Sequence, residues 1–149
     1  AGIETMADGR SVFRSYGSMT YSLLKSYLLC DLDPRDERVK AALAWMGENY
    51  QLDWNPGMEH DTANGPESRY QGLYYYYLSI ARCLAVAEKG KVALPEALRG
   101  WREDLSKALV SRQKQDGGWQ NHVGRWYEDK ESLCTAYALI ALQACLGEE

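Results

Sequence analysis

The chain has 149 residues, of which 46% are hydrophobic and 26% are charged, as expected for a soluble globular domain with one core. Its formal net charge of -4 removes the electrostatic argument for nucleic acid or an anionic membrane surface as a partner. The longest uncharged apolar run, residues 133–142, is far shorter than the ~18 residues that a membrane-spanning helix needs. Neither nucleic acid nor a membrane span is therefore expected.

Five helices are predicted along the chain, and the first two differ in how much of their surface is apolar. Residues 18–30 carry apolar and aromatic side chains around most of the helical circumference, which predicts a largely buried helix. The second helix is expected to begin with Asp33 as N-cap and Pro34 at the first helical position. It has one narrow apolar stripe, from Val39 to Tyr50, so only one of its sides should be buried.

The remaining segments continue this alternation of buried and half-exposed helices. Residues 51–70 are rich in Gly, Pro, Asn and Asp and are predicted to form a loop. A third helix over 71–89 and a fifth over 132–146 are predicted to be buried, whereas the fourth, over 96–114, has a single apolar stripe. No run shows convincing period-2 alternation, so the predicted fold class is all-α.

Two pairs of segments are similar within the chain. "MTYSLLKSYLL" and "CTAYALIALQA" share a Thr, a nearby Tyr and a Leu-rich helix, and "LDWNPG" and "QDGGWQN" each place an Asp, a Trp and a Gly just past a half-exposed helix. Repeated helix pairs form stacked units that cannot bury their faces alone. Two and a half such units indicate an incomplete array.

The second of these turns fits a known motif. Gln113, Gly117 and Trp119 match the Q-x3-G-x-W core of the QW motif of squalene and oxidosqualene cyclases and related prenyltransferases, although Ala108 replaces the aromatic residue usually found upstream. Glycines here permit the left-handed turn that ends a helix. Gln113 and Trp119 are expected to pack against each other, which gives the tryptophan a structural role at the junction between units.

Nearly the whole chain, from about Tyr16 to Leu146, resembles bacterial prenyltransferase/squalene-oxidase-repeat proteins, through "YGSMTYSLLKSYLL", "NPGM", "GLYYYYLSIA" and "RWYEDKESLCTAYALIAL". The resemblance implies a partial α/α toroid, in which the first, third and fifth helices are inner and the second and fourth are outer and antiparallel to them. The start "AGIETMADGR" has neither an initiator Met nor a signal peptide's apolar centre, so residues 1–149 are expected to be one domain, the C-terminal part of a longer chain. The expected partner is the missing N-terminal half of the ring or another chain.

The catalytic signatures of that family do not carry over. Class II cyclases place the acid of D-x-D-D before a Thr, where this chain has Met19 and Cys134, and it contains no D-x-D-D. The zinc-binding His of protein prenyltransferases would also fall on Cys134, and His60 and His122 lack ligand spacing. No metal or cofactor is expected, and any catalytic residues of a terpenoid cyclase- or prenyltransferase-like enzyme would lie outside this segment.

Tyrosine is the abundant aromatic residue, with eleven Tyr and five Trp against one Phe. Both rings are used where an apolar body must also reach water or a polar partner. Tyrosines near the starts of the inner helices are therefore the candidates to line a cavity for an apolar, isoprenoid-like ligand: Tyr16, Tyr21, Tyr70, Tyr74 and Tyr137. Two alternatives stay open: that these rings are core, and that the domain is a non-catalytic scaffold or protein-interaction toroid.

An acidic cluster precedes the fifth helix. Glu128, Asp129 and Glu131 lie next to Arg125 and Lys130 in the sequence. Carboxylates at this position stabilise a helix N-terminus from solvent. The cluster is therefore predicted to be solvated rather than part of a site.

Overall fold

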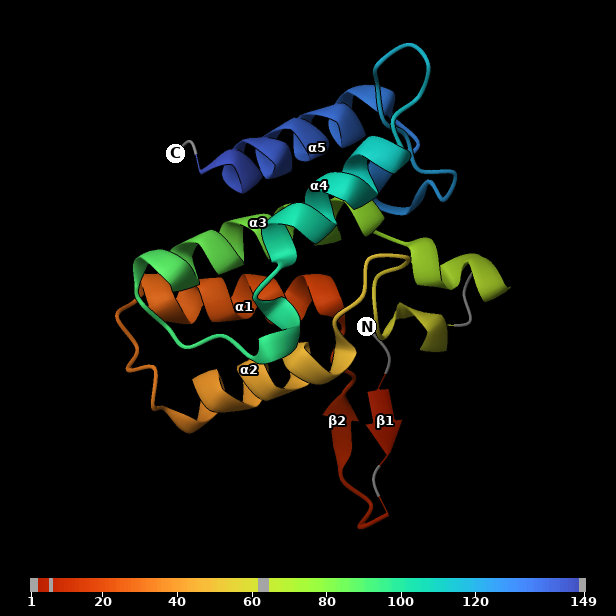
Figure 1. Ribbon diagram of the computed structural model, residues 1–149. Coiled ribbons are helices and arrows are strands. Elements are labelled where there is room, and N and C mark those ends of the chain that lie inside the picture. Colours follow the sequence, from red (N-terminus) through yellow and green to blue (C-terminus); the bar gives the residue numbers. More distant parts are fainter. Residues whose placement is uncertain (1–2, 6, 62–64, 148–149) are drawn as a thin grey trace.

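The computed structural model describes residues 3–5, 7–61 and 65–147 (Figure 1). Most of the described chain is helical, as predicted. The α-helices are α1 (Gly17–Leu29), α2 (Glu37–Asn49), α3 (Leu73–Lys89), α4 (Trp101–Ser111) and α5 (Glu131–Leu146). Short 3-10 helices connect them: η1 (Met58–His60), η2 (Gly65–Tyr70), η3 (Glu96–Leu98) and η4 (Arg125–Tyr127).

The helices form two layers. In the first layer α3 lies between α1 and α5 and packs along both (Figure 1). α2 packs against α1 and α4 against α5, and α2 also contacts η3, which leads into α4, so these three elements form the second layer. The core lies between the layers, where Met46 of α2 and Leu105 of α4 are fully buried in one cluster with Tyr76 of α3.

Burial within the first layer differs from the predicted alternation. α3 is buried on nearly all sides, but Leu23 of α1 is 50% exposed, and Leu139 and Ile140 of α5 are 55% and 40% exposed. A helix with apolar side chains all round was expected to be enclosed. α1 and α5 flank the layer instead, so each has a first-layer neighbour on one side only and keeps an open apolar face.

A short β-hairpin at the N-terminus corrects the prediction of a fold without strands. β1 (Ile3–Thr5) pairs antiparallel with β2 (Ser11–Phe13), and Ile3 lies opposite Phe13. The Asp8 carboxylate accepts a hydrogen bond from the Arg10 amide within the connecting turn (3.0 Å). Strands of three residues are too short to display period-2 alternation, so the hydrophobic pattern could not reveal them.

The second helix begins three residues later than predicted. Its N-cap is Asp36, whose carboxylate accepts from the Arg38 amide at 2.9 Å. Asp33 makes the same contact with the Arg35 amide (2.8 Å), but in a turn before the helix. The sequence repeats an Asp-x-Arg pattern here, and either aspartate can cap by local hydrogen bonding, so position alone did not decide between them.

The predicted fourth helix is interrupted. η3 ends at Leu98, and α4 begins at Trp101 with Gly100 as its N-cap. Glycine is a poor helix former, and the break allows both Leu98 and Trp101 to be fully buried. The predicted loop over 51–70 likewise contains two 3-10 helices, η1 and η2, which bring it close to the start of α3.

Candidate functional site: an aromatic pocket

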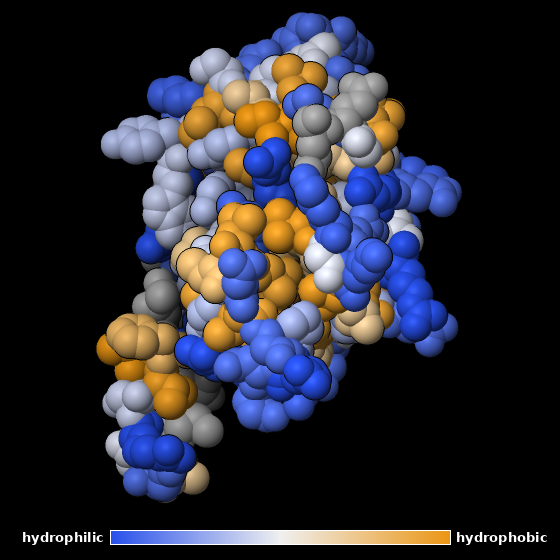
Figure 2. All heavy atoms as spheres, turned by 90° about the vertical axis from the view of Figure 1, so that its left-hand side faces the viewer, coloured by the Kyte–Doolittle hydropathy of each residue, from blue (hydrophilic) through white to orange (hydrophobic). Residues whose placement is uncertain are grey.

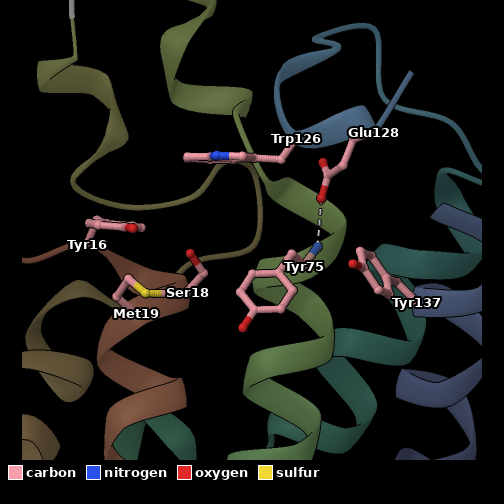
Figure 3. A pocket seen from close by; sticks show the side chains of 7 residues that line it. All are labelled: Tyr16, Ser18, Met19, Tyr75, Trp126, Glu128 and Tyr137. Atoms are coloured by element: carbon pink, nitrogen blue, oxygen red, sulfur yellow. Dashed lines mark hydrogen bonds between the residues drawn. The ribbon is translucent and has the colours of Figure 1, made fainter. Parts of the chain in front are cut away.

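A pocket of about 320 Å³ lies at the ends of α1 and α3 where these helices begin, beside the first turns of α5 (Figure 3). Three helices and the segment before α5 contribute its walls. The lining residues are Tyr16, Ser18, Met19, Tyr75, Trp126, Glu128 and Tyr137. Four of these carry aromatic rings and one carries a carboxylate, so the pocket combines apolar surface with a single formal charge.

Trp126 reaches the pocket from a backbone turn of unusual geometry. Trp126 and Tyr127 have φ values of 59° and 65°, in the left-handed region that bulky residues rarely adopt. Such conformations cost of order 1–3 kcal/mol each and persist where the surroundings impose them. Arg125 supplies this restraint, because its Nη1 donates to Asp61 Oδ2 (2.9 Å) and Gln71 Oε1 (2.6 Å) while its guanidinium stacks 4.7 Å from the Trp126 ring centre.

The indole of Trp126 also rests against Gly72, the residue before α3. Gly72 has φ 65°, and a Cβ added there would lie 3.0 Å from Cζ3 of the indole. Any larger residue would therefore strain the backbone and displace the ring. Gly72 thus fixes both the start of α3 and the position of Trp126.

Glu128 is the buried acidic group of the pocket wall, with 1% of its surface exposed. Its carboxylate accepts hydrogen bonds from the amides of Tyr75 (2.8 Å, Figure 3) and Tyr74 (3.3 Å) and from Asn121 Nδ2 (2.7 Å). It thereby caps α3, whose N-cap, Gly72, has no side chain. Burial raises the pKa of Glu128, and these hydrogen bonds oppose that rise.

This position corrects the predicted solvated acidic cluster. Asp129 and Glu131 are exposed, as expected, but Glu128 turns inward and stabilises the N-terminus of α3 rather than that of α5. Trp126 and Tyr127, the two residues just before Glu128, both have left-handed φ values. Sequence spacing gave no signal of such a turn, because neither residue is one that normally adopts it.

Asn55 organises the neighbouring start of α1. This fully buried side chain accepts from the Ser18 amide (3.1 Å), and its Nδ2 donates to Ser18 Oγ (3.2 Å) and to the carbonyl of Gln71 (3.1 Å). The amide of Gly17 donates to the Pro56 carbonyl (2.7 Å). One asparagine therefore joins the first turn of α1 to the segment that enters α3, which holds two walls of the pocket together.

Two of the five predicted cavity tyrosines, Tyr16 and Tyr137, line this pocket. The other three lie elsewhere. Tyr21 packs edge-on against Tyr76 in the core (5.8 Å between ring centres), Tyr74 against Tyr77 (5.7 Å), and Tyr70 against His122 (5.0 Å). For Tyr21 and Tyr74, the open alternative that these rings are core matches their placement.

The pocket residues that sequence reasoning missed are Ser18, Met19, Tyr75, Trp126 and Glu128. Tyr75 had a usable signal. Four consecutive tyrosines turn through about 300° of helix, so one of them has to face away from the side that the others bury. Tyr75 is that residue, 36% exposed, while Tyr74, Tyr76 and Tyr77 are buried.

The residues of the QW-like motif lie at the turn after α4. Gln113 Nε2 donates to the Gly117 carbonyl (2.8 Å), and Gly117 has φ 87°. The Trp119 indole is 2% exposed and donates to the Leu109 carbonyl of α4 (2.8 Å), while the Trp119 amide donates to Thr135 Oγ1 of α5 (3.0 Å). Trp119 therefore connects α4 to α5, whereas Gln113 is exposed and closes the turn itself.

A second concavity lies at the opposite end of the first layer. Figure 2 shows this end, where hydrophobic side chains gather in the middle and hydrophilic ones surround them. The concavity, about 650 Å³, is lined by apolar Leu28, Leu32, Val86 and Val92 together with charged residues such as Asp31 and Lys89. It lacks aromatic side chains and is wide and mixed in character, so the aromatic pocket is the more specific site.

Neither a metal-binding cluster nor a membrane-spanning helix is found in the described part of the chain. No group of three or more His, Cys, Asp or Glu side chains among those residues is placed to hold a metal ion. His60 and His122 instead pair with Glu59 and Glu67. Across the same residues, no helix combines the length and apolarity needed to cross a membrane.

Comparisons of the chain with models of known families, with curated proteins and with solved structures found no match. The pocket is therefore interpreted from its own geometry and chemistry.

Proposed function

We propose that the chain is a repeat domain of the squalene cyclase and prenyltransferase type that binds an apolar, isoprenoid-like ligand in the aromatic pocket. The observation that carries the proposal is the convergence of four aromatic rings, from Tyr16, Tyr75, Trp126 and Tyr137, on one cavity. Its volume of about 320 Å³ falls at the lower end of the range for small-molecule sites. Aromatic walls of this kind suit a flexible hydrocarbon chain.

In this proposal α1, α3 and α5 are inner helices of a partial α/α toroid, and α2 and α4 are outer helices. The open apolar faces of α1 and α5, with Leu23, Leu139 and Ile140 exposed, would then meet the rest of the ring. A contiguous exposed apolar surface is uncommon on a monomer beyond a few hundred Å². The rest of the ring would be a preceding part of the chain or a partner chain.

The proposal is one of binding rather than catalysis by this segment. Among the described residues of the pocket wall, Glu128 is the one with a carboxyl group, and both of its oxygens already accept hydrogen bonds from amide groups. The positions that would carry the acid or the zinc ligand in the resembling families hold Met19 and Cys134. Catalytic residues, if the complete protein is an enzyme, would come from outside these residues.

A scaffold is the second candidate function, and the exposed apolar residues of α1 and α5 are the observation in its favour. A scaffold would use these faces for contact with protein, and the pocket would have no ligand. The two candidates differ in whether the pocket binds a small molecule with measurable affinity.

Titration with farnesol or a squalene analogue, followed by the intrinsic fluorescence of the chain's five tryptophans, tests the proposal. We expect saturable binding at micromolar ligand, and we expect Tyr75→Ala to weaken it about tenfold, as for a central aromatic contact. Tyr127→Ala is the matched control, because this neighbouring ring is 74% exposed and does not line the pocket. Absence of saturable binding by the wild type would leave the scaffold as the better interpretation.

A further inference from the structure

The electrostatic character of the pocket distinguishes it from a purely apolar cavity. Among the residues that line it, Glu128 is the one with a formal charge, and that charge is negative. No lysine or arginine lines the pocket. An anionic ligand would therefore meet a carboxylate with no cationic side chain on the pocket wall to offset it.

Glu128 also lacks a full counter-charge. Its carboxylate accepts hydrogen bonds from backbone amides at the start of α3 and from the side-chain amide of Asn121, and no ion pair to it is found among the described residues. The N-terminus of a helix supplies roughly half a positive charge. A buried carboxylate is costly when its charge is not compensated, so a positive group beside Glu128 would be favoured.

The aromatic walls point to the same kind of ligand. The faces of Trp and Tyr attract cations, and quaternary ammonium groups are bound in this way by cages of aromatic rings. Tyr16, Tyr75 and Trp126 surround the centre of the pocket from different sides (Figure 3). Arg125 already stacks on Trp126 at 4.7 Å, but its own charge is paired with Asp61 at 2.9 Å, so it does not neutralise Glu128.

The hydrogen bonds that Glu128 and Ser18 already accept favour a cation that brings few donors of its own. The Glu128 oxygens accept hydrogen bonds from backbone and side-chain amides, and Ser18 Oγ accepts one from Asn55. A primary ammonium group brings three donors that need acceptors. A quaternary ammonium group brings none and requires charge and ring faces, which the pocket offers.

We propose that the pocket binds a ligand with a quaternary ammonium group, enclosed by Tyr16, Tyr75 and Trp126 and balanced by the carboxylate of Glu128. This inference rests on the proposed function, since it concerns the same pocket, and adds the chemical class of the ligand's head group. The ligand is then amphiphilic, with a cation at the helix starts and an apolar remainder along the aromatic wall.

An isosteric pair of probes tests the charge directly. Choline and 3,3-dimethylbutan-1-ol have the same shape, but the first carries a quaternary nitrogen where the second carries carbon. In NMR titrations of the whole chain we expect choline to bind saturably, with upfield shifts of its methyl protons caused by the surrounding rings. The neutral alcohol should bind at least about tenfold more weakly. Equal affinity for the two probes would overturn the cation proposal.

Two substitutions assign the effect to the pocket. Glu128→Gln removes the charge with little change in shape and should weaken choline at least about tenfold while leaving the alcohol unaffected. Asp129→Asn is the matched control, because this neighbouring carboxylate is exposed and does not line the pocket. Should Glu128→Gln fail to fold, Trp126→Leu serves instead. Leucine is also apolar and would occupy the same left-handed backbone position, but it removes the aromatic ring.

The possible failures are distinguishable. If farnesol binds and choline does not, the cation proposal is wrong and the proposed function stands. If neither probe nor farnesol binds, both are wrong. Choline affinity that is unchanged in the Glu128 and Trp126 variants places its binding elsewhere and also overturns the inference.

Discussion

The turns that follow α2 and α4 each contain a Gln, an Asp, a Trp and an Asn in that order, although at different spacings. In each, a glutamine side chain closes the turn on a nearby carbonyl: Gln51 Nε2 donates to the Trp54 carbonyl (2.5 Å) and Gln113 Nε2 to the Gly117 carbonyl (2.8 Å). Each turn also ends in a buried asparagine, Asn55 or Asn121. The two turns therefore share a way of ending the helix and of reaching the start of α3.

The tryptophans mark the difference between the two turns. Trp119 is buried and its indole donates to the Leu109 carbonyl at the end of α4 (2.8 Å). Trp54 is only half-buried, and the guanidinium of Arg69 stacks 5.4 Å from its ring centre. The same residue type thus ties helices together in the second turn and covers a loop in the first.

The turn after α2 is held by side chains of α3 rather than by a side chain of its own. Tyr76 and Tyr77 of α3 donate their hydroxyl groups to the carbonyls of Gln51 (2.9 Å) and Leu52 (2.6 Å). In both turns an aromatic side chain that donates a hydrogen bond joins the turn to a helix. After α4 this side chain belongs to the turn itself, whereas after α2 it belongs to α3. A buried tryptophan therefore connects the turn after α4 to the helices, whereas tyrosines of α3 do this for the turn after α2.

Truncating the tryptophans should give the largest contrast. Trp119→Ala removes a buried indole and its hydrogen bond, and we expect a loss of about 3–5 kcal/mol in the free energy of unfolding. Trp54→Ala should cost about 1–2 kcal/mol, because that ring is already partly solvated. Chemical denaturation of both variants measures the difference, and similar losses would contradict the assignment of the tie to Trp119.

Replacing Asn55 should have the next largest effect. Asn55→Ala leaves the Ser18 amide and the Gln71 carbonyl without this partner in a buried environment, at a cost of about 2 kcal/mol. Asn55→Asp retains the acceptor for the Ser18 amide but places a carboxylate oxygen against the buried Gln71 carbonyl, so it should be no more stable than Asn55→Ala. Thermal unfolding compares the two, and an aspartate variant clearly more stable than the alanine variant would show that the cap of α1 outweighs the contact with Gln71.

Comparing the turns also shows what the sequence could predict. Five helices followed from long periodic segments, and the turn after α4 followed from Gly117, whose left-handed φ a glycine readily adopts. The Q-x3-G-x-W match singled out Trp119 and not Trp54, and in the structure Trp119 is buried whereas Trp54 is half-buried. That difference depends on which helix packs over each turn.

The candidate site was harder to predict for a physical reason. Tyr16 and Tyr137 lie in or beside predicted helices, where periodicity indicates a direction. Trp126 and Glu128 reach the pocket through a left-handed turn made by residues that seldom adopt it. Such a conformation is imposed by distant partners, here Asp61 and Gln71 through Arg125, and has no local sequence signal.

The hydrogen bonds from Tyr76 and Tyr77 to the turn after α2 should each contribute less to the free energy of unfolding. Tyr76→Phe removes the hydroxyl that the Gln51 carbonyl accepts from, and we expect a loss of about 1–1.5 kcal/mol. Tyr77→Phe should cost less, about 0.5–1 kcal/mol, because Arg112 Nη2 also donates to the Leu52 carbonyl at 3.2 Å. The midpoints of denaturant unfolding, compared at an unchanged slope of free energy against denaturant, measure both losses. A larger loss for Tyr77→Phe than for Tyr76→Phe would show that Arg112 does not share the Leu52 carbonyl.

The smallest expected effect is a dependence of stability on pH. It concerns only the turn after α4, because Asn121 of that turn donates a hydrogen bond to the titrating carboxylate of Glu128. Burial raises the pKa of Glu128 above its ordinary value of 4.5, so between that value and the higher native pKa the folded chain binds more protons than the unfolded chain. The contribution of Glu128 to stability is therefore greatest at low pH and falls as the pH rises through this window.

Glu128→Gln provides the reference for this measurement, because glutamine does not titrate and every other group is common to both proteins. We expect the melting temperature of the wild type, relative to that of the variant, to increase as the pH is lowered from neutral toward the ordinary pKa of 4.5. Asn55 accepts a hydrogen bond from the first turn of α1, as Glu128 does from that of α3, but it carries no charge, so Asn55→Ala should show no such change relative to the wild type. A wild-type advantage over Glu128→Gln that shrinks on acidification would mean that the amides of Tyr74, Tyr75 and Asn121 outweigh burial at this carboxylate.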